Sequence, residues 1–175
     1  MARLRKFVAY RRLGRPYTRV SKFRAKSYIR TNPRSLVVRY DMGDPKKNFD
    51  YTLTLAAKQD LNIRDNALES ARQTSLKLLE PIGANNFYFR LRVYPFQILR
   101  ENPLAAGAGA DRFSTGMQKA FGKPTGQAAR IKKGQVIFEA RVDKANVNLA
   151  KKALTRAKTK LPCSCRIEAK EKKII

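Results

Sequence analysis

Residues 65–93, DNALESARQTSLKLLEPIGANNFYFRLRV, join a helical pattern to a strand pattern and so decide the class of fold. Asn66 and Glu69 have the spacing of a capping box, and Asp65 lies beside them at the expected helix start. Pro81-Ile82-Gly83 ends the run. The residues that recur at helical spacing between these limits are Ala67, Leu68, Ala71, Ser75, Leu78 and Leu79. The pattern predicts an amphipathic helix whose apolar stripe belongs to a core rather than to a ligand groove.

The strand that follows alternates between apolar and polar side chains. The apolar set is Phe87, Phe89, Leu91 and Val93, and the polar set is Tyr88, Arg90, Arg92 and Tyr94. A solvated strand face is one interpretation of the polar set. In a strongly cationic chain, two arginines flanked by two tyrosines also suit contact with RNA phosphates and bases. We therefore expect Arg90 and Arg92 to bind RNA.

Further elements are predicted on both sides of this stretch. In chain order they are a strand over 36–40 with a turn at 41–45, a strand over 51–55, two strands within 128–142 about a turn at 132–134, a helix from Asn146 to the residue before Pro162, and a strand over 163–169. This order predicts an α+β fold, a two-layer sandwich in which two main helices cover one face of a mostly antiparallel sheet. A basic N-terminal extension and a long Ala/Gly loop complete the expected chain.

The expected domain organisation is simple. Residues 1–35 form a basic, aromatic-rich RNA-binding extension, residues 36–170 a single α+β domain with a flexible loop at 102–112, and residues 171–175 a charged tail. No apolar run reaches the 18 residues that suggest a membrane span, so no membrane partner is expected.

Charge is concentrated at the N-terminus. The first forty residues hold thirteen Lys or Arg and no acid, half of the net charge of +26. The breakers Gly14, Arg15-Pro16 and Asn32-Pro33 predict an extended arm. So many like charges repel one another unless a polyanion neutralises them, and nucleic acid supplies a dense row of phosphates. A solvated basic tail is the alternative, but the aromatic residues threaded through the segment favour a defined shape.

Catalysis is disfavoured by composition. The chain has no histidine, its thirteen acids are scattered, and it lacks the glycine motifs that bind nucleotides. Cys163 and Cys165 have no further thiol or imidazole with which to hold zinc, so we expect reduced packing residues and no cofactor. A DNA-compacting or chaperone-like basic protein shares the charge but leaves the ordered strand pattern unexplained.

Composition alone does not decide the role of two glycine-rich segments. Residues 102–112, NPLAAGAGADR, are either a flexible surface loop or a loop that enters a crowded place. Residues 113–121 suggest one or two helical turns. The turn expected at Gly122-Lys123-Pro124-Thr125-Gly126 can present backbone N–H groups and a cation to phosphate, although its spacing is a weak signal.

A group of motifs in the second half resembles one family. These motifs are Gly109-Ala-Asp-Arg112, Thr115-Gly-Met117, Ala120-Phe-Gly-Lys-Pro124, Gly126, Ala129-Arg130 and Gly134-Gln-Val-Ile137, together with Arg15-Pro16-Tyr17 and Arg90-Leu-Arg-Val-Tyr-Pro-Phe96. Taken together they closely resemble the archaeal and eukaryotic form of the universal large-subunit ribosomal protein L sixteen, also called L ten e. The resemblance covers essentially the whole chain.

The resemblance implies a structural protein of the large ribosomal subunit, bound to ribosomes in the cytoplasm. It implies binding to large-subunit ribosomal RNA between the central protuberance and the peptidyl transferase centre, contact with neighbouring ribosomal proteins, and late entry into the subunit. It also implies that loop 102–112 extends toward tRNA acceptor ends and helps to position tRNA. No catalytic residue, metal or homo-oligomer is expected. Unlike the more varied eukaryotic loop, this one is almost wholly Ala and Gly.

The candidate site residues fall into three sets. On the extension, those expected to bind RNA are Arg3, Arg5, Lys6, Arg11, Arg12, Arg15, Tyr17, Arg19, Lys22, Arg24 and Lys26. On the body they are Arg90, Arg92, Lys119, Lys123, Arg130, Lys132 and Lys133. The expected tRNA-proximal residues are Asn102, Gly107, Gly109, Asp111 and Arg112.

Overall fold

A computed structural model of the chain describes residues 6–14, 33–102, 106–112, 116 and 122–172. Its larger sheet has five strands in the order β1-β4-β7-β2-β8, and every neighbouring pair is antiparallel. The strands are β1 (Asp41–Gly43), β2 (Tyr51–Ala57), β4 (Phe87–Leu91), β7 (Val136–Val142) and β8 (Cys165–Glu171). The longer edge strand, β8, carries charged side chains along most of its length.

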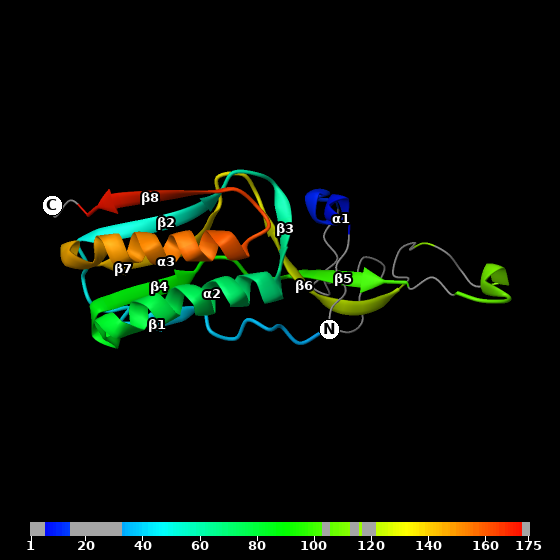
Figure 1. Ribbon diagram of the computed structural model, residues 1–175, viewed down its shortest axis with the longest axis horizontal. Helices are drawn as coiled ribbons and strands as arrows, with labels where there is room; N and C mark the ends of the chain where they lie inside the picture. The colour runs from blue at the N-terminus through cyan, green and yellow to red at the C-terminus, as the bar shows by residue number, and fades with distance from the viewer. Residues whose placement is uncertain (1–5, 15–32, 103–105, 113–115, 117–121, 173–175) are drawn as a thin grey trace, which may run out of the picture.

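Two long helices, α2 (Asp65–Leu79) and α3 (Val147–Lys160), lie side by side over one face of this sheet (Figure 1). Four residues of the predicted apolar stripe, Leu68, Ala71, Ser75 and Leu79, are buried. The Ser75 hydroxyl donates to the Ala153 carbonyl at 3.1 Å, which satisfies it between the helices. The predicted α+β class, with two main helices against antiparallel strands, is confirmed.

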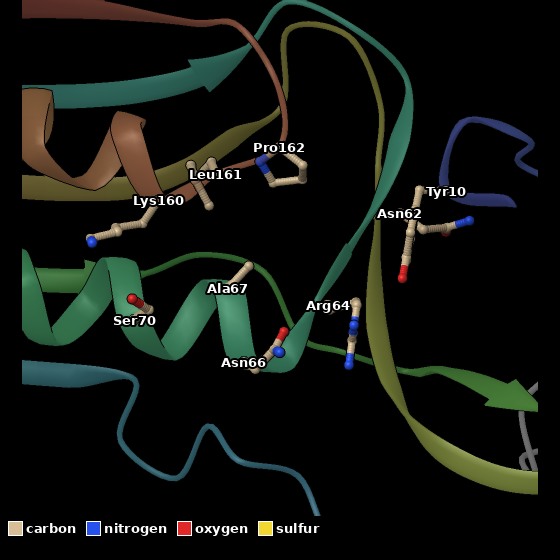
Figure 2. Close-up of a pocket in the computed structure, with 9 residues that line it drawn as sticks. All are labelled: Tyr10, Asn62, Arg64, Asn66, Ala67, Ser70, Lys160, Leu161 and Pro162. Carbon is tan, nitrogen blue, oxygen red and sulfur yellow. The ribbon is translucent and has the colours of Figure 1, made fainter. Parts of the chain in front are cut away.

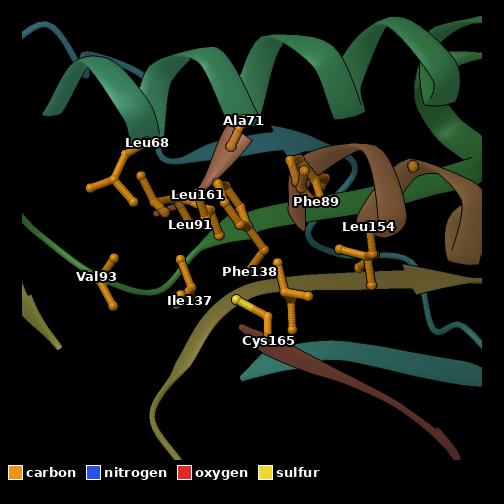
Figure 3. Packing of buried hydrophobic residues seen from close by; sticks show 14 of the residues in the cluster. Leu68, Ala71, Phe89, Leu91, Val93, Ile137, Phe138, Leu154, Leu161 and Cys165 are labelled. Carbon is orange, nitrogen blue, oxygen red and sulfur yellow. The ribbon is translucent and has the colours of Figure 1, made fainter. Parts of the chain in front are cut away.

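The core fills the space between the helices and the sheet. Phe89 and Phe138 lie on neighbouring strands with their rings stacked, 5.2 Å between centroids and 6° between planes. Figure 3 shows Leu68 and Ala71 of α2 above this layer, with Leu154 of α3 in the same cluster. Cys163 and Cys165 are buried free thiols, as packing residues should be.

A second, smaller sheet continues the molecule along its long axis (Figure 1). It contains β3 (Leu61–Arg64), β5 (Gln97–Glu101) and β6 (Lys123–Ile131) in the order β3-β6-β5, all antiparallel. The prediction of one sheet is therefore wrong in this detail. Alternating side chains identify a strand but not its neighbour, and β6 pairs with β3 and β5 rather than with β7.

Short helical turns complete the described elements. They are the α-helix α1 (Phe7–Arg11) and the 3-10 turns η2 (Glu80–Ile82), η3 (Ala84–Asn86), η4 (Ala110–Arg112) and η5 (Lys144–Asn146). The second long helix begins after Asn146 and ends just before Pro162, as its sequence predicts.

The first predicted strand is displaced. Residues 36–40 form no strand, and β1 occupies Asp41–Gly43, where a turn is predicted. The pairing partner explains the difference, because Asp41, Met42 and Gly43 align with Arg90, Phe89 and Tyr88 of β4. Gly43 adopts φ +83°, and a side chain there would clash with the Phe87 carbonyl oxygen. β-Propensity is thus overruled by backbone pairing.

The predicted capping box of α2 does not form. The N-cap lies two residues earlier than the box predicts, at Arg64 rather than Asn66, so the helix begins at Asp65 with no side-chain cap bond. The Glu69 carboxylate instead accepts hydrogen bonds from Arg72 Nε at 2.8 Å and from Gln73. A guanidinium on the same helix face is a stronger partner for a carboxylate than a neutral backbone N–H.

Candidate nucleic-acid interface

The face of the larger sheet away from α2 and α3 carries a row of arginines. Arg90 on β4 and Arg141 on β7 alternate with the buried residues Phe89 and Ala140, so they point to the face opposite the helices. Arg92 follows β4 and is also exposed. We call Arg90, Arg92 and Arg141 the sheet-face arginines.

Each sheet-face arginine is held by a carboxylate. Arg90 Nε lies 3.3 Å from Asp41 Oδ1, and Arg92 Nη1 lies 2.6 Å from Glu139 Oε2. Arg141 Nη2 contacts the other Glu139 oxygen at 2.7 Å. Since a guanidinium has five N–H donors, these ion pairs orient the arginines and leave further donors for phosphate. About half of the Arg92 side chain, 49%, stays exposed.

Glu139 is the buried centre of this cluster. Burial alone would raise the pKa of its carboxyl, but hydrogen bonds from Arg92 and Arg141 outweigh burial and lower the pKa below its ordinary value. Only 4% of the residue is exposed. At neutral pH an ionised Glu139 therefore fixes two cations side by side on the sheet.

Tyr88 differs from its prediction. It is 4% exposed, although the alternation places it on the solvent side. Arg141 lies over the Tyr88 ring, with its guanidinium carbon 5.1 Å from the ring centroid, and the Tyr88 hydroxyl donates to Asp41 Oδ1 at 2.5 Å. Burial first, then this hydrogen bond, raises the pKa of Tyr88. The ring supports Arg141 and is covered by it.

The described start of the N-terminal extension is anchored to the smaller sheet. Residues 7–11 are helical rather than extended, and Tyr10 is 8% exposed against the body. Asn62 Nδ2 donates to the Arg12 carbonyl at 3.4 Å, and Arg130 Nη2 donates to the Gly14 carbonyl at 2.8 Å. Arg130, expected to bind RNA, thus holds the extension in place. The prediction of an extended arm is wrong for these residues because a buried tyrosine fixes them.

A cavity of about 400 Å³ lies where α1, β3 and the facing ends of α2 and α3 meet (Figure 2). Tyr10 and Asn62 stand on one side, and Ser70 and Lys160 on the other. The full lining is Tyr10, Asn62, Arg64, Asn66, Ala67, Ser70, Lys160, Leu161 and Pro162. Two of these residues are cationic and none is acidic. The cavity is therefore open to a neutral or anionic group.

The remaining candidate cations on the described body lie near turns or strand ends. Lys132 and Lys133 are exposed between β6 and β7, where Lys133 N donates to Asp60 Oδ1 and Gly134 adopts φ +81°. Lys123 is exposed as the first residue of β6. The predicted turn at 122–126 is wrong, because Lys123 and Pro124 pair with Glu101 and Arg100. Lys6, Arg11 and Arg12 are exposed on or beside α1.

The described part of loop 102–112 reaches the far end of the molecule, beyond β5 (Figure 1). Gly107 and Gly109 adopt φ +118° and +80°, so the chain turns there with glycine conformations. Asp111 and Arg112 are exposed on η4. Asn102 Nδ2 donates to the Gly116 carbonyl at 3.1 Å and closes the base of the loop.

Several candidates lie outside the described residues: Arg3, Arg5, Arg15, Tyr17, Arg19, Lys22, Arg24, Lys26 and Lys119. The segment 113–121, where helical turns are predicted, is described only at Gly116.

Sequence reasoning missed Arg141 and the roles of Tyr10 and Glu139. Glu139 and Arg141 alternate with Phe138, Ala140 and Val142, and this pattern could have placed both on the polar face of a strand. No comparable signal marks Tyr10, since its burial depends on contact with a distant strand.

Within the described ranges, no cluster of three potential metal ligands occurs. No helix there is long and apolar enough to cross a bilayer.

Comparison with known proteins gives this interface its context. The family described as ribosomal protein L16p/L10e matches residues 14–168. The chain belongs to that family. The predicted resemblance is thereby confirmed, as are a structural rather than enzymatic role and a ribosome-bound, cytoplasmic location.

Archaeal relatives agree over nearly the full length. The chain is 45% identical over 160 residues to the large ribosomal subunit protein uL16 of Thermofilum pendens, covering 90% of this chain and 92% of that protein. Its identity to the protein of the same name from Methanococcus maripaludis is 47% over 154 residues, covering 87% and 86% of the two chains. The uL16 protein of Archaeoglobus fulgidus is 45% identical over 159 residues, with 90% and 88% covered.

Proposed function

We propose that this chain is a structural constituent of the large ribosomal subunit that binds ribosomal RNA between the central protuberance and the peptidyl transferase centre. It helps to position tRNA through loop 102–112 and joins the subunit late in assembly. Its partners are ribosomal RNA, neighbouring ribosomal proteins and the acceptor ends of tRNA. The observation that carries the proposal is a uL16-family chain whose helix-free sheet face presents oriented arginines.

Charge distribution supports a division of labour along the molecule. The extension contributes twelve of the thirty-nine Lys and Arg, and the sheet-face arginines add a second cationic surface. These surfaces suit the phosphate backbone, which attracts cations without regard to sequence. RNA helices that approach both surfaces would be held in a fixed orientation.

Loop 102–112 is suited to a different contact. Residues 103–110 contain no Lys or Arg, and their side chains are small apart from Pro103 and Leu104. The described tip, η4, lies at the far end of the long axis from the β8 end of the larger sheet (Figure 1). A slender, weakly charged projection can enter a narrow space between RNA strands without being captured by the first phosphate that it meets.

The test measures the salt dependence of binding to a large-subunit ribosomal RNA transcript. If six to ten phosphates are contacted, affinity should fall by about 10³–10⁵ between 50 and 200 mM salt. Replacing Arg11, Arg12, Arg15 and Arg19 by Gln should reduce the slope of log affinity against log salt by roughly one for each lost contact. Core folding, followed by near-ultraviolet circular dichroism, should persist.

A charge-matched variant provides the control. Lys151, Lys152, Arg156 and Lys158 are exposed on α3, which covers the opposite face of the sheet. Replacing these four by Gln should change the slope less than the extension variant does. Equal changes would indicate that only total charge matters and would contradict the proposed orientation. A wild-type slope near zero would refute RNA binding itself.

A further inference from the structure

Three aromatic rings from two separate segments stack on the surface next to β4 and β5. Tyr40 and Tyr94 are stacked, with centroids 5.3 Å apart and an angle of 20° between planes. Phe96 continues the series, its centroid 4.5 Å from that of Tyr94 and its plane tilted by 44°. We call these residues the aromatic stack.

The backbone holds the aromatic stack in place. The Phe96 N–H donates to the Tyr94 carbonyl at 3.0 Å, which closes a three-residue turn about Pro95. Pro95 is buried, and its ring restricts φ to values that suit this turn. At the other end, Tyr40 packs against the core, and its backbone carbonyl accepts a hydrogen bond from Leu91 N at 2.8 Å. The rings are therefore ordered before any ligand arrives.

Exposure increases along the aromatic stack. Tyr40 is partly buried, Tyr94 is 47% exposed and Phe96 is 61% exposed. A phenylalanine exposed to this extent contributes little to the core, so its position is not explained by folding. An aromatic ring at the free end of a rigid stack offers a flat, apolar surface to a second flat group.

The charge of the surroundings selects the kind of partner. Arg39 adjoins Tyr40 in the chain and is exposed, and Arg92 lies two residues before Tyr94 with half of its side chain exposed. A chain of net charge +26 repels basic proteins and attracts polyanions. Among polyanions, nucleic acid is the class that carries flat rings next to its charges.

We propose that Tyr94 and Phe96, supported by Tyr40, form a stacking platform for an unpaired base of RNA. The inference rests on the proposed function and makes it more specific, since phosphate contacts alone require no aromatic surface. Arg39 and Arg92 would contact the phosphates that flank the stacked base.

The experiment compares two ligands that differ only in their bases. One is a single-stranded RNA of about twelve nucleotides, within the usual site size, and the other is an abasic ribose–phosphate strand of the same length. Phe96→Ala should weaken binding of the RNA roughly 5- to 150-fold and leave binding of the abasic strand unchanged. Val38→Ala, at a residue that is 70% exposed and outside the aromatic stack, should change neither.

Stacking at position 96 can be followed directly by the fluorescence of Phe96→Trp, because the wild-type chain contains no tryptophan. Its fluorescence should be quenched by excess RNA and not by the abasic strand, even when RNA also binds elsewhere on the molecule. Absence of quenching, or equal weakening of both ligands by Phe96→Ala, would overturn the platform while leaving the proposed function intact. Failure of the wild-type chain to bind the twelve-nucleotide RNA would also overturn the platform, whereas failure to bind the ribosomal RNA transcript would refute the proposed function.

Discussion

At the scale of single residues, Glu139 shows how a buried acid can serve a basic surface. It carries no RNA-binding chemistry, yet its two oxygens hold Arg92 and Arg141 in a fixed arrangement. Without it, two neighbouring guanidinium groups would repel each other and spread over many rotamers. The acid therefore reduces net charge by one while it organises two cations for a polyanion.

Replacing Glu139 by Gln should destabilise the fold by about 1 kcal/mol at neutral pH, since both arginines are partly solvated. The lowered pKa of Glu139 means that its contribution is present above the ordinary pKa of a glutamate. It is lost as the pH falls through the lower, folded-state pKa. Urea denaturation of both proteins at intervals between neutral and acidic pH measures the difference.

The difference in unfolding free energy between wild type and Glu139→Gln should shrink toward acidic pH. Glu171→Gln is the matched control, because Glu171 lies at the exposed end of β8. A difference that stays constant down to acidic pH would show that the carboxylate charge at position 139 is not what stabilises the cluster.

At the scale of elements, the shortest strand depends on one glycine. β1 has three residues, and Gly43 brings its end against the Phe87 carbonyl in a conformation that other residues avoid. The same carbonyl accepts a hydrogen bond from Asp44 N at 3.0 Å. The pairing of β1 with β4 therefore leaves no room for a side chain at position 43.

Replacing Gly43 by Ala should cost more than about 2 kcal/mol, because a steric clash is added to left-handed strain. Gly107→Ala is the control, since Gly107 also has positive φ but has open space around it. Thermal unfolding should therefore show a much larger loss at position 43. Similar losses at both positions would mean that conformation alone, without the clash, accounts for the effect.

Sequence patterns predicted those elements that depend on local periodicity. The apolar stripe of α2, the extent of α3 and the strand positions of β2, β4 and β7 are properties of consecutive residues, and these predictions are confirmed. Three predictions are wrong: the capping box, the turn at 41–45 and the single sheet. Each depended on a partner distant in sequence or on a competing ion pair. The predicted exposure of Tyr88 is wrong for the same reason, since Arg141 covers its ring.

At the scale of the whole molecule, the fold separates its surfaces by distance. The sheet-face arginines lie on the five-stranded body, whereas the tip of loop 102–112 lies beyond the smaller sheet (Figure 1). The two proposed activities, RNA binding and tRNA positioning, should therefore be separable by mutation. Additivity is expected for sites so far apart.

Deleting residues 103–110 should leave affinity for ribosomal RNA within about twofold, because the span has no cation to lose. The same deletion should impair tRNA binding to large subunits reconstituted with the variant. Filter binding with each RNA measures the two effects. Replacing the span by Gly and Ser at equal length controls for the connection between β5 and β6. Loss of binding to isolated ribosomal RNA would contradict the separation.

The edges of the five-stranded sheet affect how readily the unassembled protein aggregates. β1 is too short to recruit another strand, and β8 presents Arg166, Glu168, Lys170 and Glu171 along its open side. Charged edge strands oppose the pairing that leads to aggregates. The proposed late entry into the subunit would leave the chain unassembled for a time, and these charged edges would then oppose pairing with other copies of itself.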